Sequence, residues 1–129
     1  MLAEGPLWSS GGERGLFKTS DGGDTWKLVL SGNKWTGVTD IVIDPRDQKT
    51  LYAATWQRHR TVAAYIGGGE GTALYKSTDG GETWDKLKTG LPTGEMGKIG
   101  LAISPINPDV LYAAIELDRR EGAIYRSDD

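Results

Sequence analysis

The sequence contains no cysteine among its 129 residues, and it has only one histidine and one phenylalanine. The absence of cysteine excludes disulfides, thiolate metal sites and cysteine nucleophiles, and it leaves the redox compartment open. No apolar run approaches the roughly 20 residues that a membrane-spanning helix needs, so we expect no membrane partner. The opening residues, MLAEGPLW, lack a basic segment followed by an apolar one, so no signal peptide is visible there.

Positive charge is also scarce. The formal net charge is −3, and the basic residues are scattered apart from the short RHR segment at 58–60. A protein that binds nucleic acid would be expected to carry a basic stripe or patch. We therefore exclude nucleic acid as a partner.

Glycine and tryptophan, in contrast, are abundant. The chain has 19 glycines and five tryptophans, and glycine normally makes up only about 7% of a sequence. With 37% apolar and 26% charged residues, the composition is that of a folded chain, not a disordered one. Many glycines between short apolar runs predict an all-β fold that is rich in turns.

Two sequence motifs occur more than once. KTSDGGDTWKLV (18–29) closely matches KSTDGGETWDKL (76–87), and AIYRSDD (123–129) begins a third copy. DIVIDPRDQKTLYAAT (40–55) matches GLAISPINPDVLYAAI (100–115). The corresponding tryptophans, Trp26 and Trp84, are 58 residues apart, and the corresponding prolines, Pro45 and Pro105, are 60 apart. A repeat of about 50–60 residues is typical of propellers and solenoids.

One repeat unit contains four predicted strands. In the central unit they are the apolar run at 40–43, LYAAT at 51–55, the alternating ALYKS at 73–77 and TWDKL at 83–87. Four antiparallel strands per repeat predict a β-propeller blade. We therefore predict a single partial β-propeller over 1–129, of about two and a half blades.

The blade boundaries follow from the same motifs. Residues 37–94 form a complete blade, 95–129 contribute the first three strands of another, and 6–36 contribute the last three, with GPLWSS (5–10) as the second strand. The two incomplete blades do not add up to a complete one, and a closed propeller needs at least about four blades. We expect the chain to be a segment of a larger propeller, or to self-associate through exposed edge strands.

The glycine-rich motif resembles the Asp-box, also called the bacterial neuraminidase repeat. Together with the proline-led LYA segment, it is similar to large bacterial propeller proteins of the sortilin-like and xyloglucanase-like kind. This resemblance implies the propeller fold, a box that lies in a turn away from ligands, and a secreted or extracytoplasmic location. The box positions are Thr19, Asp21, Gly23, Thr25 and Trp26 in the first copy, and Ser77, Asp79, Gly81, Thr83 and Trp84 in the second.

The box has two interpretations. Its acids suggest a calcium loop, but two carboxylates in a short turn supply few of the six to eight or so oxygens that calcium takes. The structural interpretation explains every position. Asp79 accepts backbone hydrogen bonds in an Asx-type turn, the glycines allow positive φ, and Trp84 packs between blades. We favour it, and we predict no metal and no cofactor.

Ligand binding is expected at the opposite end of the blade, where the connections are long. The candidates are Trp35, Trp56, Arg58 and Arg60, since indole faces stack on sugars and arginines bind carboxylates. The structural alternative is that Trp56 extends the packing between blades and that the arginines pair with acids of a neighbouring blade. His59 has no visible partner for catalysis, and GGGEG at 67–71 has no helix after it that would favour phosphate binding.

The sequence identifies no catalytic residue. We therefore expect a non-catalytic scaffold or interaction segment, with neighbouring blades, a second copy, a glycan or a peptide as partner. The alternative is part of a glycoside hydrolase or carbohydrate-binding propeller of the sialidase-like or xyloglucanase-like type. A hydrolase would need two carboxylates across a cleft.

Overall fold

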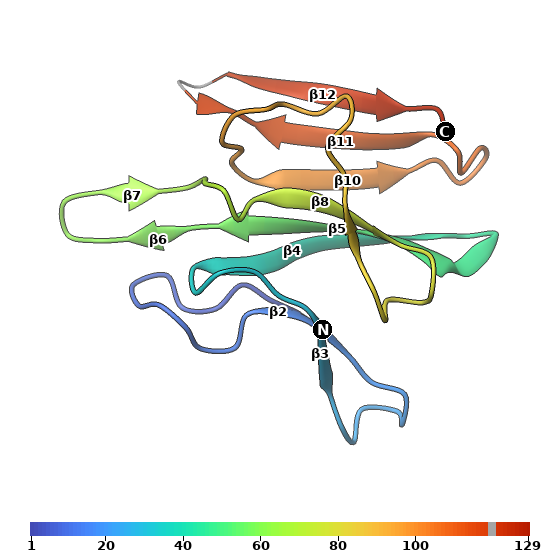
Figure 1. Cartoon of the computed structure of the whole chain (residues 1–129), viewed down its shortest axis with the longest axis horizontal. Coiled ribbons are helices and arrows are strands. Elements are labelled where there is room, and N and C mark those ends of the chain that lie inside the picture. Colours follow the sequence, from blue (N-terminus) through green and yellow to red (C-terminus); the bar gives the residue numbers. More distant parts are fainter. Residues whose placement is uncertain (119–120) are drawn as a thin grey trace.

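The chain forms antiparallel β-sheets that are stacked in sequence order. The computed structural model describes residues 1–118 and 121–129, and every regular element in this part of the chain is a β-strand. Figure 1 shows the N-terminal sheet at the bottom, the central sheet in the middle and the C-terminal sheet at the top. None of the sheets is closed on itself. The all-β prediction is confirmed.

The central sheet has four strands, in the order β4, β5, β8, β9. Its second strand is covered on both faces, because every residue from Leu51 to Trp56 is buried. Ala53 and Ala54 are fully buried, and their small side chains let the neighbouring sheets approach closely. The predicted strands are all present, but the last one is shorter than expected. The observed bounds are β4 (Thr36–Asp44), β5 (Asp47–Gln57), β8 (Ala73–Ser77) and β9 (Asp85–Lys86).

The N-terminal sheet has three strands, β1 (Leu2–Ala3), β2 (Gly15–Lys18) and β3 (Lys27–Leu30). The prediction that GPLWSS forms a strand is wrong, since Leu2 and Ala3 are the residues that pair with β2. Gly5 has a φ of 70°, and Pro6 has no N–H to donate to a ladder. Residues 4–14 instead form a loop between β1 and β2.

The C-terminal sheet consists of β10 (Ile99–Ile103), β11 (Leu111–Glu116) and β12 (Gly122–Ser127), in that order. Buried and exposed residues alternate along β11, so one face of this sheet is covered and the other faces solvent. On the solvent face, Ile124 is 75% exposed and Tyr112 is 40% exposed.

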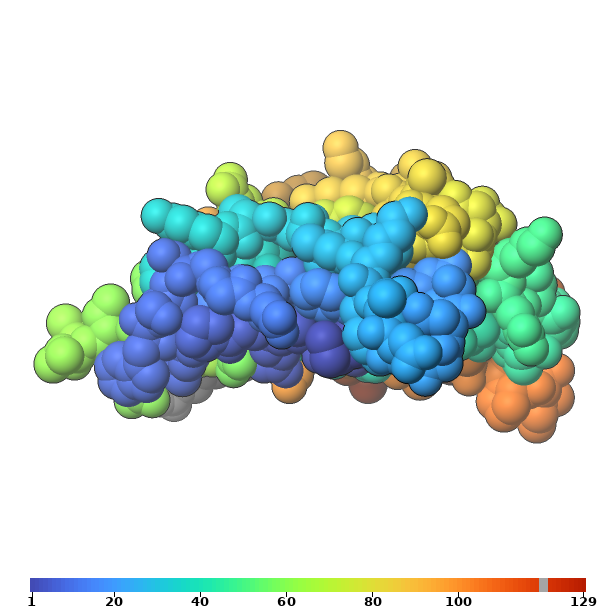
Figure 2. Space-filling view, turned by 90° about the horizontal axis from the view of Figure 1, so that it is seen from below, coloured from blue at the N-terminus to red at the C-terminus, as the bar shows by residue number. Residues whose placement is uncertain are grey.

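The connections lie at two opposite ends of the stack. The box turns and the proline-led turns lie at one end, which we call the box end, on the right of Figure 1. The opposite end, the loop end, carries loops 4–14, 31–35, 58–72 and 87–98. Within 58–72, strands β6 (His59–Arg60) and β7 (Tyr65–Ile66) form a hairpin, whose green tip projects at the left of Figure 2.

Two hydrophobic cores join the three sheets. The first core lies between the N-terminal and central sheets, and the second lies between the central and C-terminal sheets. Each buried leucine, isoleucine, valine or methionine side chain contributes about 1.5–3 kcal/mol. The buried members of the first core are Leu16, Leu30, Val38 and Ala53, and those of the second are Ala54, Leu74, Met96, Ile99, Ala113 and Ile115.

Ion pairs at the box end also join each sheet to its neighbour. Glu82 of the central box turn pairs with Lys18 at 2.6 Å and with Lys27 at 2.9 Å, both from the N-terminal sheet. Arg46 of the central sheet pairs with Asp109 of the C-terminal sheet at 2.8 Å. Each pair of neighbouring sheets therefore has a core and an ion pair of its own.

Candidate functional site

The box of the central sheet is a turn closed by Asp79. Its Oδ1 accepts hydrogen bonds from the Ser77 hydroxyl at 2.8 Å, from Glu82 N at 2.9 Å and from Thr83 N at 2.9 Å. Its Oδ2 accepts the Thr83 hydroxyl at 2.5 Å. Donation by Thr83, and then by Ser77, holds the pKa of the Asp79 carboxyl well below its usual range.

The box of the N-terminal sheet has the same geometry. Asp21 Oδ1 accepts the Thr19 hydroxyl at 2.6 Å and Thr25 N at 3.0 Å, and Oδ2 accepts the Thr25 hydroxyl. The Thr19 hydroxyl, followed by that of Thr25, lowers the pKa of the Asp21 carboxyl. The threonine at position 19 therefore replaces the serine of the other copy without loss of the turn.

The glycines and the tryptophan complete each turn. Gly80 and Gly81 have φ angles of 77° and 84°, a region that favours glycine. Gly81 donates its N–H to Ser77 Oγ at 2.8 Å, and its carbonyl accepts the Trp84 indole N–H at 3.2 Å. The carboxylate thus accepts hydrogen bonds from its own turn, as the structural interpretation of the box requires. Among the described residues, no group of three or more His, Asp or Glu side chains is arranged to hold a metal ion.

The two box tryptophans differ in their surroundings. Trp84 is half-buried and packs against the first core, where Val29, Ile41 and Tyr75 also lie. Trp26 is 46% exposed, although it makes the same indole hydrogen bond within its own turn, to Gly23 O at 3.1 Å. Packing between sheets is therefore observed for Trp84.

At the loop end, Trp56 and Arg58 lie within the protein. Trp56 is only 8% exposed and donates its indole N–H to Gly67 O at 2.7 Å. The Arg58 guanidinium lies 4.9 Å from the Trp56 ring centroid and pairs with Glu4 at 2.6 Å. Glu4 belongs to the loop that follows β1, so this arginine joins the central sheet to the N-terminal segment. Arg58 thus pairs with an acid of the N-terminal segment, whereas these contacts of Trp56 lie within residues 37–94.

Trp35 stacks on His59. Their ring centroids are 4.4 Å apart, and the planes differ by 29°. The Arg14 guanidinium lies 5.9 Å from the Trp35 ring. Sequence reasoning did not identify Arg14, but this residue is buried and organises the first loop. It donates to carbonyl oxygens of the backbone at Glu4, Pro6, Ser9, Gly11 and Trp35.

Arg60 is the predicted candidate that faces solvent. Its guanidinium lies 5.6 Å from the Trp8 ring centroid and 6.0 Å from that of Tyr65. Both rings are open to solvent, with Trp8 63% and Tyr65 52% exposed. Sequence reasoning missed Trp8 because it assigned this residue to a strand. The three side chains form an exposed aromatic and basic surface, which we call the Arg60 patch.

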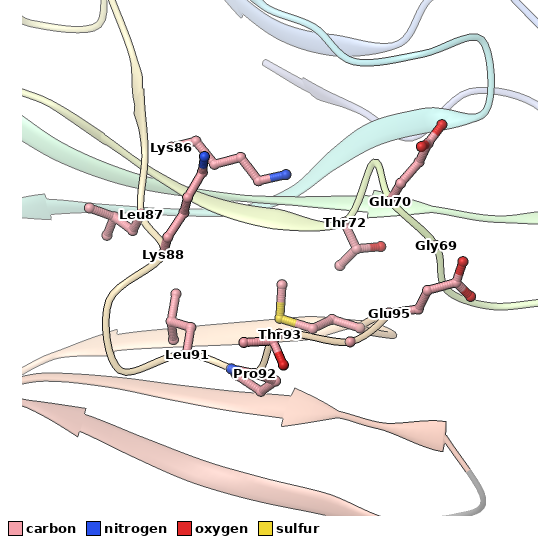
Figure 3. A pocket seen from close by; sticks show the side chains of 12 residues that line it. Gly69, Glu70, Thr72, Lys86, Leu87, Lys88, Leu91, Pro92, Thr93 and Glu95 are labelled. Atoms are coloured by element: carbon pink, nitrogen blue, oxygen red, sulfur yellow. The ribbon is translucent and has the colours of Figure 1, made fainter.

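A cavity also lies at the loop end. It has a volume of about 530 Å³ and lies between the connection at 87–96 and the turn at 69–72 (Figure 3). Leu87, Leu91, Pro92 and Met96 give it an apolar lining. Lys86 and Lys88 lie on one side of Figure 3, and Glu70 and Glu95 lie on the other. Sequence reasoning named neither glutamate, since neither belongs to a repeated motif.

The GGGEG segment uses its backbone amides within the chain. Gly69 N donates to Met96 O at 3.2 Å, and Gly71 N donates to Gln57 Oε1 at 3.0 Å. Strand β8 follows the segment. These contacts fit a turn that joins the central sheet to the 87–98 loop. The expectation that this segment is not a phosphate loop stays a prediction.

Two curated proteins are similar to parts of this chain. A probable oligoxyloglucan-reducing end-specific xyloglucanase from Neosartorya fischeri is 33% identical over 85 residues, which are 63% of this chain and 9% of that protein. A dispase autolysis-inducing protein from Streptomyces mobaraensis is 38% identical over 71 residues, which are 54% of this chain and 18% of that protein. The chain spans less than a fifth of the length of either relative.

No protein-family model matches the sequence, and no solved structure matches it. Within the described residues, no helix is long and apolar enough to cross a membrane.

Proposed function

We propose that the chain contributes consecutive blades to a larger Asp-box β-propeller and acts there as a non-catalytic scaffold. The blades correspond to residues 6–36 together with the short strand at Leu2–Ala3, to 37–94, and to 95–129. The scaffold holds the loop end rigid, and the Arg60 patch is its contact surface for a partner.

The observation that carries this proposal is the repeated stacking of the three sheets. Each neighbouring pair shares a hydrophobic core and a box-end ion pair, and the aspartate of each box accepts hydrogen bonds from its own turn. Such repetition is the packing principle of repeat proteins, in which each unit buries its apolar face against the next. The matched segments are only 9% and 18% of the two relatives, which supports a segment of a larger array.

The proposal is tested on the full-length protein by comparing variants of the two ends. We expect Trp8→Ala and Arg60→Ala to reduce binding to glycan or peptide arrays, since both residues belong to the Arg60 patch. The matched control is Trp26→Ala, which removes an exposed indole at the box end and should leave binding unchanged. Equal effects of the loop-end and box-end substitutions would contradict the proposal.

A second candidate, a glycoside hydrolase segment, is favoured by one observation. Glu70 and Glu95 both line the 530 Å³ cavity at the loop end. Glycoside hydrolysis uses a pair of carboxyl groups, one as the acid and the other as base or nucleophile. The relative from Neosartorya fischeri is named as a xyloglucanase, which makes xyloglucan a substrate to include in the assay.

Turnover decides between the two candidates. The full-length protein is incubated with a panel of polysaccharides, and reducing ends are measured. The scaffold proposal expects no turnover. The hydrolase candidate expects turnover that Glu70→Gln or Glu95→Gln reduces by at least about 100-fold, as loss of an essential acid or base does.

A further inference from the structure

The cavity of about 530 Å³ at the loop end lies where the two box-containing sheets differ. In the N-terminal sheet, β3 continues to Leu30, which pairs with Leu16. In the central sheet, β9 ends at Lys86, and Lys88 stands at the position equivalent to Leu30. The connection at 87–96 lines the cavity instead of continuing the strand. The repeat therefore does not require this cavity, which belongs to the central sheet and its outgoing connection.

The lining of this cavity, which we call the charged cavity, comes from one part of the chain. Every described residue in the lining lies between Gly69 and Met96, and none of them belongs to the N-terminal or the C-terminal sheet. Gly69 and Met96 form an isolated antiparallel bridge, in which the Gly69 N–H donates to Met96 O at 3.2 Å. The shape of the charged cavity is therefore set by contacts within residues 69–96.

The floor of the charged cavity is apolar and continuous with the second core. Met96 is buried in that core, and Leu87 and Leu91 pack against it. Thr72 is 2% exposed, and its hydroxyl accepts the Gln57 N–H at 3.0 Å. A hydroxyl has a proton as well as lone pairs, so Thr72 can also donate to a ligand. An apolar lining with few polar groups, at this volume, is typical of sites for small ligands.

Charges of opposite sign lie on the two sides of the charged cavity. Lys86 and Lys88 lie on one side of Figure 3, and Glu70 and Glu95 lie on the other. The ion pairs of the described residues join other side chains, so these four charges have no ion-pair partner in that part of the chain. Glu82 of the box turn, in contrast, has two lysine partners. A ligand with one positive and one negative end would meet both signs.

These three features define the chemistry of a matching ligand. Lysines bind a carboxylate and glutamates bind an ammonium, in both cases through charge-assisted hydrogen bonds. The apolar floor between the two sides favours an aliphatic body. A short peptide with free termini and apolar side chains carries these groups in this order, and its peptide carbonyl is an acceptor for the Thr72 hydroxyl.

We propose that the charged cavity binds short apolar peptides with free termini. Lys86 and Lys88 bind the carboxylate of the peptide, and Glu70 and Glu95 bind its ammonium. This site goes beyond the scaffold function, because it uses none of the residues of the Arg60 patch. It also gives the two glutamates a binding role in place of the catalytic role that the hydrolase candidate assigns to them.

The first test is isothermal titration calorimetry of the full-length protein with the tripeptide trileucine. We expect saturable binding. N-acetyl trileucine lacks the ammonium and trileucine amide lacks the carboxylate, so each should bind at least about ten-fold more weakly, as the loss of a charge-assisted contact predicts. Failure to saturate at millimolar peptide, or equal binding of the three peptides, would overturn the proposal.

Paired changes in the protein and the peptide assign the two ends. A variant with both Lys86→Ala and Lys88→Ala should bind trileucine about ten-fold more weakly, and amidation should then have no further effect, because the partner of the carboxylate is already absent. With Glu70→Gln and Glu95→Gln, N-acetylation should have no further effect. The matched control is Lys49→Ala, which changes an exposed lysine at the box end and should leave all binding unchanged. Additive losses would overturn the assignment.

An oligosaccharide is the competing occupant, because the hydrolase candidate places its substrate in the same cavity. Xyloglucan oligosaccharides are therefore added to the titration as competitors. The proposal expects that they leave the binding of trileucine unchanged. Competition by the sugar would overturn it in favour of the hydrolase candidate. The scaffold function is tested separately through the Arg60 patch variants, so the two proposals fail independently.

Discussion

The two box turns share most of their internal hydrogen bonds but differ in their surroundings. Asp21 and Asp79 each accept bonds from a hydroxyl two residues earlier and from a threonine four residues later. Yet Trp84 packs against the first core, whereas Trp26 is 46% exposed. The comparison shows that the box is a local turn, and that its tryptophan stabilises the fold only where a neighbouring sheet covers it.

The largest expected difference is between the two tryptophans. Trp84→Ala should lower the free energy of unfolding by about 2–3 kcal/mol, less than the 3–5 kcal/mol of a fully buried tryptophan because Trp84 is half-buried. Trp26→Ala should cost less than about 1 kcal/mol, as exposed substitutions do. Urea unfolding of both variants measures the difference. Equal losses would show that the indole acts within its own turn and not between sheets.

Substitution of the box glycines should lower the free energy of unfolding by similar amounts in the two boxes. Gly23 and Gly81 have φ angles of 110° and 84°, so alanine is strained at both positions. We expect Gly23→Ala and Gly81→Ala each to cost about 1–2 kcal/mol, since the strain is local. The same urea experiment applies. A much larger loss for Gly81→Ala would mean that the turn geometry is coupled to the first core.

Substitution of the two aspartates should lower the melting temperature by moderately different amounts. Asp79→Asn should lower the melting temperature by on the order of 5 °C and Asp21→Asn by less. An amide offers one acceptor oxygen where the carboxylate offers two, and a looser Asp79 turn also displaces Trp84. Differential scanning calorimetry at pH 7 measures both variants. A larger effect at Asp21 would contradict the comparison.

The direction of the pH effect follows from the lowered pKa of each carboxyl. The unfolded chain binds the proton more readily, so this stability is present above the ordinary aspartate value of about 3.9 and is lost as pH falls below it. The wild-type melting temperature should therefore drop below about pH 4. Asp79→Asn should flatten this drop, and an unchanged profile would show that the carboxylate is not held in the folded state.

The smallest effect is expected from the ion pairs between sheets. Glu82→Gln removes the pairs with Lys18 and Lys27, which are solvent-exposed. Exposed pairs contribute little and are screened by salt, so we expect a shift of about 1–2 °C that disappears in 1 M NaCl. Asp109→Asn, which removes the pair with Arg46, is the matched variant in the other interface. A shift that survives high salt would point to packing instead of charge.

Much of the central sheet could be predicted from the sequence, because its motifs repeat and its strands are short apolar runs between turn residues. The predicted strand at 51–55 lies within β5, and the one at 73–77 is β8 itself. GPLWSS was assigned as the second strand of its blade from the order of the motifs, whereas the strand that pairs with β2 is β1, which is only two residues long and carries no pattern. Short strands are defined by their partners and not by their own sequence.

The loop end was harder to predict, because its contacts join residues far apart in the sequence. Arg58 pairs with Glu4, and Trp35 stacks on His59; neither pair shares a motif or a period. The Arg60 patch depends on Trp8, which lies beside Arg60 because Leu7 O accepts the N–H of Arg60 at 2.9 Å. From the position of the repeated turns, the sequence predicts only at which end of the stack the long loops lie.

Arg14 has a consequence for how much the first loop can vary. Its guanidinium binds the carbonyls of the backbone at positions 4, 6, 9 and 11, and every amino acid supplies a carbonyl. The backbone path of the loop is therefore held by the side chain of its last residue, and it does not depend on which side chains stand at positions 7, 8 and 10. Residues 7–10 can therefore vary in sequence while the backbone of the loop keeps the same path.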